Sequence, residues 1–145
     1  MRKMQLNVIY RNMEVRRFSK VNAPINISNN STLTGVRATG NKLSVSFVFS
    51  SNYEPNVGLI SIEGELEFEE SRENIKRAVD EWEKSEQKNL PEELAEKVHN
   101  SIISNCMVEA TLLSREVQLP TPIPPFHLSI NKKDAAYSDT GSYIR

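Results

Sequence analysis

Cysteine is almost absent from this chain, and long apolar runs are absent altogether. With Cys106 as its only thiol, the chain can form neither an internal disulfide bond nor a zinc site built from several cysteines. No apolar run approaches the roughly 20 residues of a membrane-spanning helix, so we expect no membrane insertion. The apolar core of a secretion signal does not follow Arg2 and Lys3, and we therefore expect a cytoplasmic protein.

The sequence also lacks an excess of either charge. Eighteen basic and nineteen acidic residues give a net charge of -1, whereas nucleic-acid-binding proteins are usually basic. We therefore expect no nucleic-acid partner. The 145 residues are 38% hydrophobic, which is enough to bury one core. We predict a single domain over residues 1–130, followed by a flexible polar tail over residues 131–145.

The clearest pattern in the chain is the alternation of apolar and polar residues from Lys42 to Glu70. Side chains of a strand point to opposite faces in turn, so each run has one apolar and one polar face. Turn-forming residues separate the two runs between Ser50 and Asn56, which predicts an antiparallel pair. The apolar positions are Leu43, Val45, Phe47 and Phe49 in the first strand and Ile60, Ile62, Leu66 and Phe68 in the second.

Two further strands are predicted before this pair. Leu6 to Phe18 is rich in strand-forming residues, with a bulge expected at Asn12–Met13. Lys20 to Ser31 loses the alternation and is predicted to be a crossing loop. Leu33 to Ala38 forms a short strand, and Thr39–Gly40–Asn41 turns into the central pair. The crossing loop nevertheless carries three apolar residues, which are Val21, Ile25 and Ile27.

The spacing of apolar residues changes to that of a helix at Ser71, a residue suited to cap a helix. The first helix presents the stripe Ile75, Val79 and Trp82. A second helix begins near Pro91, and its second half is more apolar than packing on one sheet requires, which predicts a subunit interface. The predicted interface residues are Ile102, Ile103, Met107 and Ala110. Together the elements predict an α+β fold, a four-stranded antiparallel sheet with two helices on one face.

Three motifs that suggest chemistry have simpler structural interpretations. Residues 35–42, GVRATGNK, are similar to a phosphate-binding loop, but a strand follows them, which favours a hairpin turn. His99 and Cys106 can share a metal ion or act as base and nucleophile. Because no further ligands accompany them, the favoured interpretation of Cys106 is a buried structural thiol. The glutamates from Glu63 to Glu69 form either a solvated sheet face or a docking surface. We therefore expect no enzyme, no metal and no cofactor.

Four of the seven prolines lie in LPTPIPPF, residues 119–126. Proline fixes the backbone in an extended conformation, so this segment cannot be helical. It can serve as a ligand for another protein. The flanking Leu119 and Phe126 favour packing on the sheet of its own chain instead.

Short motifs occur here in the same order as in a known chaperone family. Ile9–Tyr10 opens the first strand, Asn22–Ala23–Pro24 follows it, Gly64 lies in the fourth strand, and Leu119–Pro120 follows the second helix. In this order the chain resembles the SecB family of molecular chaperones over residues 6–128. The resemblance implies an ATP-independent holdase, which binds unfolded or nascent polypeptides, prevents their aggregation and keeps preproteins competent for export. It also implies a homotetramer built as a dimer of dimers.

A holdase of this kind binds its clients in an apolar groove that polar groups surround. The residues predicted to line or border this groove are Val21, Ile25, Ile27, Phe47, Phe49, Ile123 and Phe126. SecB proteins dock the export motor SecA through acidic residues. Because Arg16, Arg17 and Leu59 stand near those positions here, we expect weak or no binding to SecA.

Two functions from other classes stay open. The chain can be a structural subunit that docks through its apolar second helix, or a small enzyme whose site lies across an oligomer interface. A homotetramer that captures unfolded protein favours the chaperone. Co-purification with one fixed partner favours the structural subunit, and turnover of a small molecule favours the enzyme.

Overall fold

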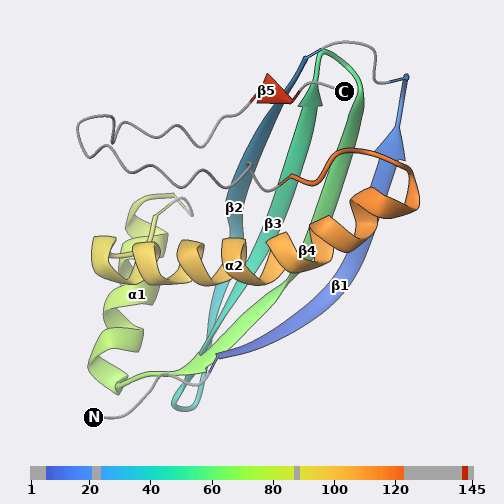
Figure 1. Cartoon of the computed structure of the whole chain (residues 1–145). Helices are drawn as coiled ribbons and strands as arrows, with labels where there is room; N and C mark the ends of the chain where they lie inside the picture. Colours follow the sequence, from blue (N-terminus) through green and yellow to red (C-terminus); the bar gives the residue numbers. More distant parts are fainter. Residues whose placement is uncertain (1–5, 21–23, 87–88, 123–141, 144–145) are drawn as a thin grey trace, which may run out of the picture.

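The computed structural model describes residues 6–20, 24–86, 89–122 and 142–143 (Figure 1). The elements in chain order are β1 (Leu6–Arg17), β2 (Ile25–Thr39), β3 (Lys42–Glu54), β4 (Gly58–Glu69), α1 (Arg72–Lys84), α2 (Glu92–Glu116) and β5 (Ser142–Tyr143). The strands form one antiparallel sheet in the order β1-β4-β3-β2-β5, and the two helices pack against it. The predicted α+β class is therefore confirmed, with β5 as a short addition. No helix among the described residues is long and apolar enough to cross a membrane.

The central strands β3 and β4 form as the alternation predicts. Leu43 lies opposite Phe68, and Phe49 lies opposite Ile62, so the apolar side chains of both strands share one face. All four residues are buried. Removal of this apolar surface from water is the main force that holds the sheet against the helices.

The edge strands differ from the prediction in two places. β1 pairs with β4 and β2 pairs with β3, so their connection does cross from one edge of the sheet to the other. However, β2 begins at Ile25, and the prediction that the crossing loop extends to Ser31 is wrong. The alternation of apolar and polar residues in β2 is broken at Asn29. This polar residue lies on the inward face of the strand, where it is hydrogen-bonded to Ser51 of β3. The bulge of β1 lies at Arg11, one residue before the predicted Asn12–Met13.

Gly64 allows β1 to approach β4 closely at this bulge. Tyr10 lies opposite Gly64, and the register shifts immediately after it. A Cβ atom on Gly64 would lie 2.4 Å from the carbonyl oxygen of Ile9 and 3.1 Å from the ring of Phe47. The absence of a side chain at this position therefore leaves room both for the backbone of the neighbouring strand and for an aromatic ring.

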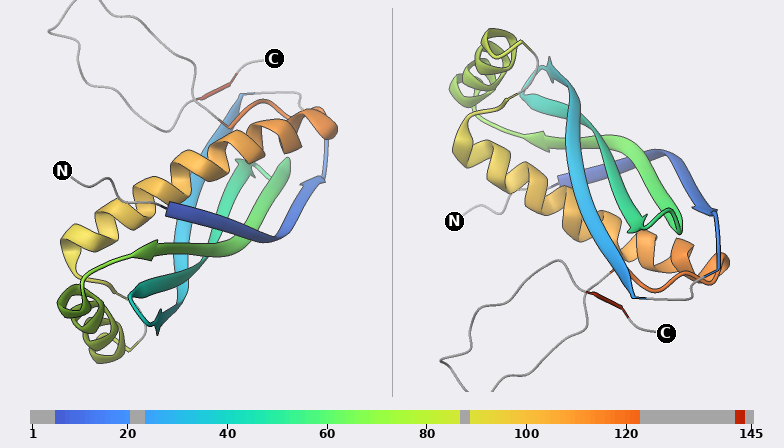
Figure 2. Two further views of the ribbon diagram at one scale, coloured as in Figure 1. Left: turned by 90° about the horizontal axis from the view of Figure 1, so that it is seen from below. Right: turned by 90° about the horizontal axis from the view of Figure 1, so that it is seen from above.

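The first helix begins where the sequence predicts. The hydroxyl oxygen of Ser71 accepts the backbone N–H of Asn74 at 3.2 Å. Ile75 and Trp82 of the predicted stripe are buried, and Val79 is half-buried. α1 packs beside the far end of β2, and α2 runs across the inward face of the sheet (Figures 1 and 2).

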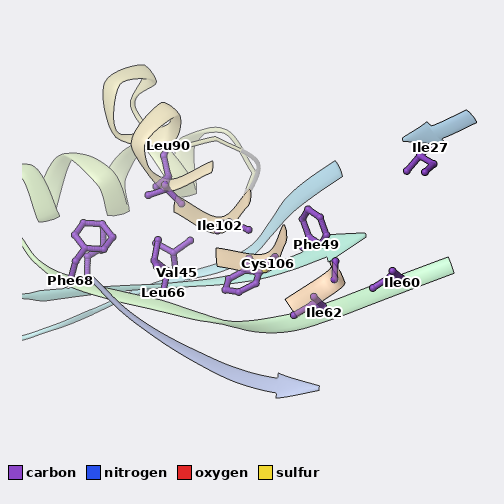
Figure 3. Packing of buried hydrophobic residues seen from close by; sticks show 14 of the residues in the cluster. Ile27, Val45, Phe49, Ile60, Ile62, Leu66, Phe68, Leu90, Ile102 and Cys106 are labelled. Carbon is purple, nitrogen blue, oxygen red and sulfur yellow. The ribbon is translucent and has the colours of Figure 1, made fainter. Parts of the chain in front are cut away.

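The core lies between α2 and the sheet. α2 buries Val98, Ile102, Cys106 and Ala110 along the face that it turns to the strands. Figure 3 shows Ile102 and Cys106 above residues of β3 and β4 such as Val45 and Leu66. The inward face of β3 and β4 is therefore occupied by the helix of the same chain.

A short strand near the C-terminus joins the sheet at the β2 edge. Tyr143 lies opposite Ile25, and Ser142 lies opposite Asn26. At these two residues the chain is a strand, not the frayed tail that the sequence predicts. Residues 131–141 of that tail lie outside the described residues, and the division at residue 130 stays a prediction.

Candidate functional site

A groove of about 680 Å³ opens between β2, α1 and the beginning of α2. Four apolar residues line it, namely Leu33, Leu90, Pro91 and Ala95. Five charged residues also line it, namely Arg77, Asp80, Glu81, Lys84 and Glu92. Leu90 is only 4% exposed, whereas all five charged residues are exposed. The groove therefore has an apolar floor and a charged rim, an arrangement that can hold apolar side chains of a partner without driving self-aggregation.

The floor of this groove carries a signal that sequence reasoning missed. Leu90 lies just before Pro91, the residue that caps α2, and Ala95 lies four residues after the cap. Apolar residues at these two positions often pack together and fix the direction in which a chain enters a helix. The third floor residue, Leu33, comes from a distant strand, and no local pattern connects it to the beginning of α2.

A hydrogen bond at the inner wall of the groove joins α2 to β2. Nδ1 of His99 lies within hydrogen-bonding distance of the hydroxyl oxygen of Ser31. Burial lowers the pKa of His99 below its usual 6.5, which favours the neutral ring. In the neutral ring, Nδ1 can accept the proton of Ser31. Among the described residues, no carboxylate is hydrogen-bonded to His99, so the pair lacks the third member of a hydrolytic triad.

Four of the predicted client-binding residues belong to β2 and β3. Ile25 and Ile27 lie in β2 and are 1% and 2% exposed, while Phe47 and Phe49 lie beneath α2 and are equally buried. These four residues are therefore core residues of the described chain, because β2 starts early enough to place its isoleucines in the core. That they border a client-binding groove stays a prediction. The remaining three predicted residues, Val21, Ile123 and Phe126, lie outside the described residues.

The predicted interface on α2 is corrected in part. Ile102 and Ala110 are buried within their own subunit, so they cannot face another one. Ile103 and Met107 are half-buried at the border of the core. Two residues outside the predicted interface set are the most exposed apolar groups of α2, Val108 at 60% and Leu112 at 52%. Their spacing of four residues places them together on one side of the helix, and this spacing was the available signal.

The segment after α2 packs against its own sheet, as its flanking apolar residues predict. Leu119 is buried, and the buried hydroxyl group of Tyr53 donates to the carbonyl oxygen of Pro120 at 2.6 Å. Asn29 of β2 donates to the carbonyl oxygen of Pro122 at 3.3 Å. Residues 123–126 of this segment lie outside the described residues.

The glutamates of β4 lie on the outer face of the sheet, where neither helix covers them. Glu65 lies between two cations, at 3.2 Å from Arg11 and at 3.4 Å from Arg37, and it also accepts the hydroxyl group of Ser44. Lys42 lies 3.7 Å from Glu67. Both arginines are more than half exposed, so these pairs balance charge at the surface and contribute little to stability. The arrangement agrees with a solvated sheet face.

Cys106 and His99 do not form a common site. Cys106 has no exposed surface, and its burial, together with the charge of Glu109, raises the pKa of the thiol to about 12. The predicted buried thiol is therefore confirmed. Within the described part of the chain, no group of three or more histidine, cysteine, aspartate or glutamate residues is placed to hold a metal ion.

Comparison with known proteins identifies no relative. No protein-family model, no curated protein and no solved structure matches this chain. The α+β architecture is therefore the part of the SecB resemblance that is observed.

Proposed function

We propose that this chain is an ATP-independent holdase of the SecB type, which binds unfolded or nascent polypeptides and prevents their aggregation. The observation that carries the proposal is the groove beside β2, which has an apolar floor and a charged rim. In an extended chain every second side chain points to the same face, so a client with apolar residues at alternate positions presents them together. The half-buried Leu33, Pro91 and Ala95 can receive one such side chain, and the rim keeps the protein itself soluble. This function requires neither a cofactor nor a catalytic residue.

Suppression of aggregation tests this function directly. A reduced, aggregation-prone protein is followed by light scattering with and without an equimolar amount of the chain. We expect slower aggregation with the wild-type chain and weaker protection by a Leu33→Ser variant. The matched control is Leu59→Ser, because Leu59 is also a half-buried strand residue but lies on the outer face. Urea denaturation confirms that both variants are folded.

Two results would count against this proposal. If the wild-type chain protects no better than an inert protein of equal size, the holdase function is wrong. If Leu33→Ser and Leu59→Ser protect equally well, the groove is not the client site, although the function stands.

We further propose that the subunits assemble into a homotetramer through the outer side of α2. Val108 and Leu112 are exposed on this side, and Glu109 is the one Asp, Glu, Lys or Arg residue between Lys97 and Arg115. A solvated helix usually carries more charge, as α1 does. Burial of the surface that remains exposed on the two side chains would contribute about 1–2 kcal/mol each.

Size-exclusion chromatography with light scattering tests this assembly. Val108→Asp combined with Leu112→Asp is expected to give smaller particles than the wild-type chain. As a control, Thr39→Asp adds one aspartate at the exposed end of β2 and is expected to leave the assembly intact. A stable wild-type monomer would contradict the proposal.

The same exposed residues also favour a second function, that of a structural subunit which docks on a different protein through α2. The aggregation assay separates the two functions, because a structural subunit gives no protection to unrelated clients. Constant co-purification with one partner would favour the structural subunit.

Weak or no binding to SecA belongs to the proposal as well. The acidic side chain of Glu14 is paired with Arg16 at 2.6 Å, and Arg17 adds a second positive charge nearby. A patch of this composition offers little attraction to a basic partner. Tight, salt-sensitive binding of SecA in calorimetry would contradict this expectation.

A further inference from the structure

The two outer edges of the sheet are protected to very different degrees. β1 carries four charged residues among its 12, Arg11, Glu14, Arg16 and Arg17, and a bulge interrupts it at Arg11. Charged side chains and bulges are features by which edge strands avoid pairing with other chains. β2 has 15 residues and a single charged one, Arg37, near its end. Its own register shift lies between Leu33 and Gly35, which leaves the stretch from Asn26 to Leu33 uninterrupted. The β2 edge is therefore the one that is open to another strand.

The structure already places a strand on this edge. β5 pairs antiparallel with Ile25 and Asn26, at the beginning of β2 (Figure 1). Beyond Asn26, no described residue pairs with β2 on that side. With respect to the described part of the chain, a stretch that begins at Ser28 therefore keeps backbone N–H and C=O groups available for a further strand.

The open stretch of β2 runs beside the groove. Leu33 belongs to both, since it is a residue of β2 and forms part of the groove floor. A strand added to this edge would direct alternate side chains toward the groove and toward the outer face of the sheet. On the outer face it would meet the uncharged polar residues Ser28, Asn30 and Thr32. Backbone pairing would supply affinity, and the groove would select apolar side chains at alternate positions.

We propose that the outer edge of β2 is a strand-acceptor site for extended polypeptides of alternating apolar and polar sequence, and that β5 of the same chain competes for it. The choice of partner rests on the proposed holdase function. The competition follows from the position of β5, because an incoming strand that extends over Ile25 and Asn26 must displace Ser142 and Tyr143. The C-terminal segment thus weakens binding until a client of sufficient length replaces it.

The test uses the full chain and a labelled peptide with the sequence of residues 139–145, DTGSYIR. Replacement of Ser142 and Tyr143 by proline removes their backbone N–H groups and disfavours pairing with β2. The matched control replaces both residues by alanine, which keeps these groups. We expect the proline variant to bind the peptide in fluorescence anisotropy about fivefold more tightly than the alanine variant, the factor expected for one or two backbone hydrogen bonds.

A second pair of variants tests which edge of the sheet binds the peptide. Asn30 of β2 and Asn7 of β1 are both exposed asparagines on the outer face, at opposite edges of the sheet. A lysine at an edge hinders strand pairing. Asn30→Lys is therefore expected to weaken peptide binding, and Asn7→Lys to leave it unchanged. An unfolded, reduced client protein is expected to displace the peptide from the proline variant.

The outcomes separate the two proposals. Equal peptide binding by the proline and alanine variants, or equal weakening by both lysine variants, would overturn the strand-acceptor site. If the client binds but does not displace the peptide, the holdase function stands and the site is wrong. If the client binds no variant, the holdase function fails, and the acceptor site fails with it.

Discussion

The close approach of β1 to β4 at Gly64 leads to a sharp prediction. Gly64→Ala adds one methyl group to a buried strand position. Its Cβ atom would lie 2.4 Å from the carbonyl oxygen of Ile9, whereas real Cβ atoms essentially never approach other atoms within 3.0 Å. The backbone of β1 or β4 must therefore move by at least 0.6 Å at the bulge. The ring of Phe47, at 3.1 Å, must also shift slightly.

The size of the effect follows from two opposing contributions. Overpacking of a well-packed core costs about 1–3 kcal/mol, and the upper half of this range applies because the nearest atom belongs to the backbone. Replacement of glycine by alanine also reduces the entropy of the unfolded chain, which stabilises the fold by about 0.4–1 kcal/mol. We expect Gly64→Ala to lower the free energy of unfolding by about 2 kcal/mol.

Gly35 provides a matched control on β2. A Cβ atom at Gly35 would lie 3.7 Å from Ser46, which is an ordinary contact distance. Gly35→Ala should therefore leave the free energy of unfolding unchanged or raise it by up to about 1 kcal/mol. Urea denaturation followed by the fluorescence of Trp82 measures both variants on the same scale.

The comparison of the two alanine variants decides whether the reasoning holds. If Gly64→Ala is as stable as Gly35→Ala, the strands can separate at the bulge without a measurable penalty, and the packing argument at this position is refuted. A changed slope of the denaturation curve would instead indicate a different native or unfolded state, and that variant could not be used for the comparison.

Three smaller predictions follow from single side chains. Ser71→Ala removes the cap of α1 and should lower the free energy of unfolding by about 1 kcal/mol in the same urea assay. Because burial lowers the pKa of His99 below 6.5, the unfolded chain binds its proton more readily. As the pH falls below 6.5, the stability of the wild-type chain should therefore decrease more steeply than that of His99→Gln. Cys106, with a pKa of about 12, should react with Ellman's reagent only after denaturation.

Local patterns in the sequence determined the central strands, the helices and the fold class. The alternation from Lys42 to Glu70 specifies two strands, because a period of two places every apolar side chain on one face. Ser71 marks the beginning of α1, because its side chain supplies a hydrogen bond that the first turn of a helix lacks. The buried state of Cys106 also follows from its place on the apolar face of α2. In each case the physical cause acts within a few residues.

Only the tertiary structure decided which apolar residues face outward. Ile25 and Ile27 stand among polar residues, yet they are buried because β2 pairs with β3 along its whole length. Their neighbour Ser31 is satisfied by His99, a residue 68 positions away. The partner of such a bond lies far away in the sequence, so no local pattern reveals it. The sequence therefore predicts a loop for the stretch that ends at Ser31.

The groove and the open strand edge depend on tertiary structure in the same way. Leu33 and Leu90 belong to elements that are far apart in the chain, and they meet because α2 crosses the sheet. Whether a strand lies at an edge depends on the order of the strands, and the crossing connection places β2 there. The sequence by itself determined the two central strands and the two helices, because propensity, periodicity and capping are local. The fold decided which surfaces remain free, because burial depends on neighbours that are distant in sequence.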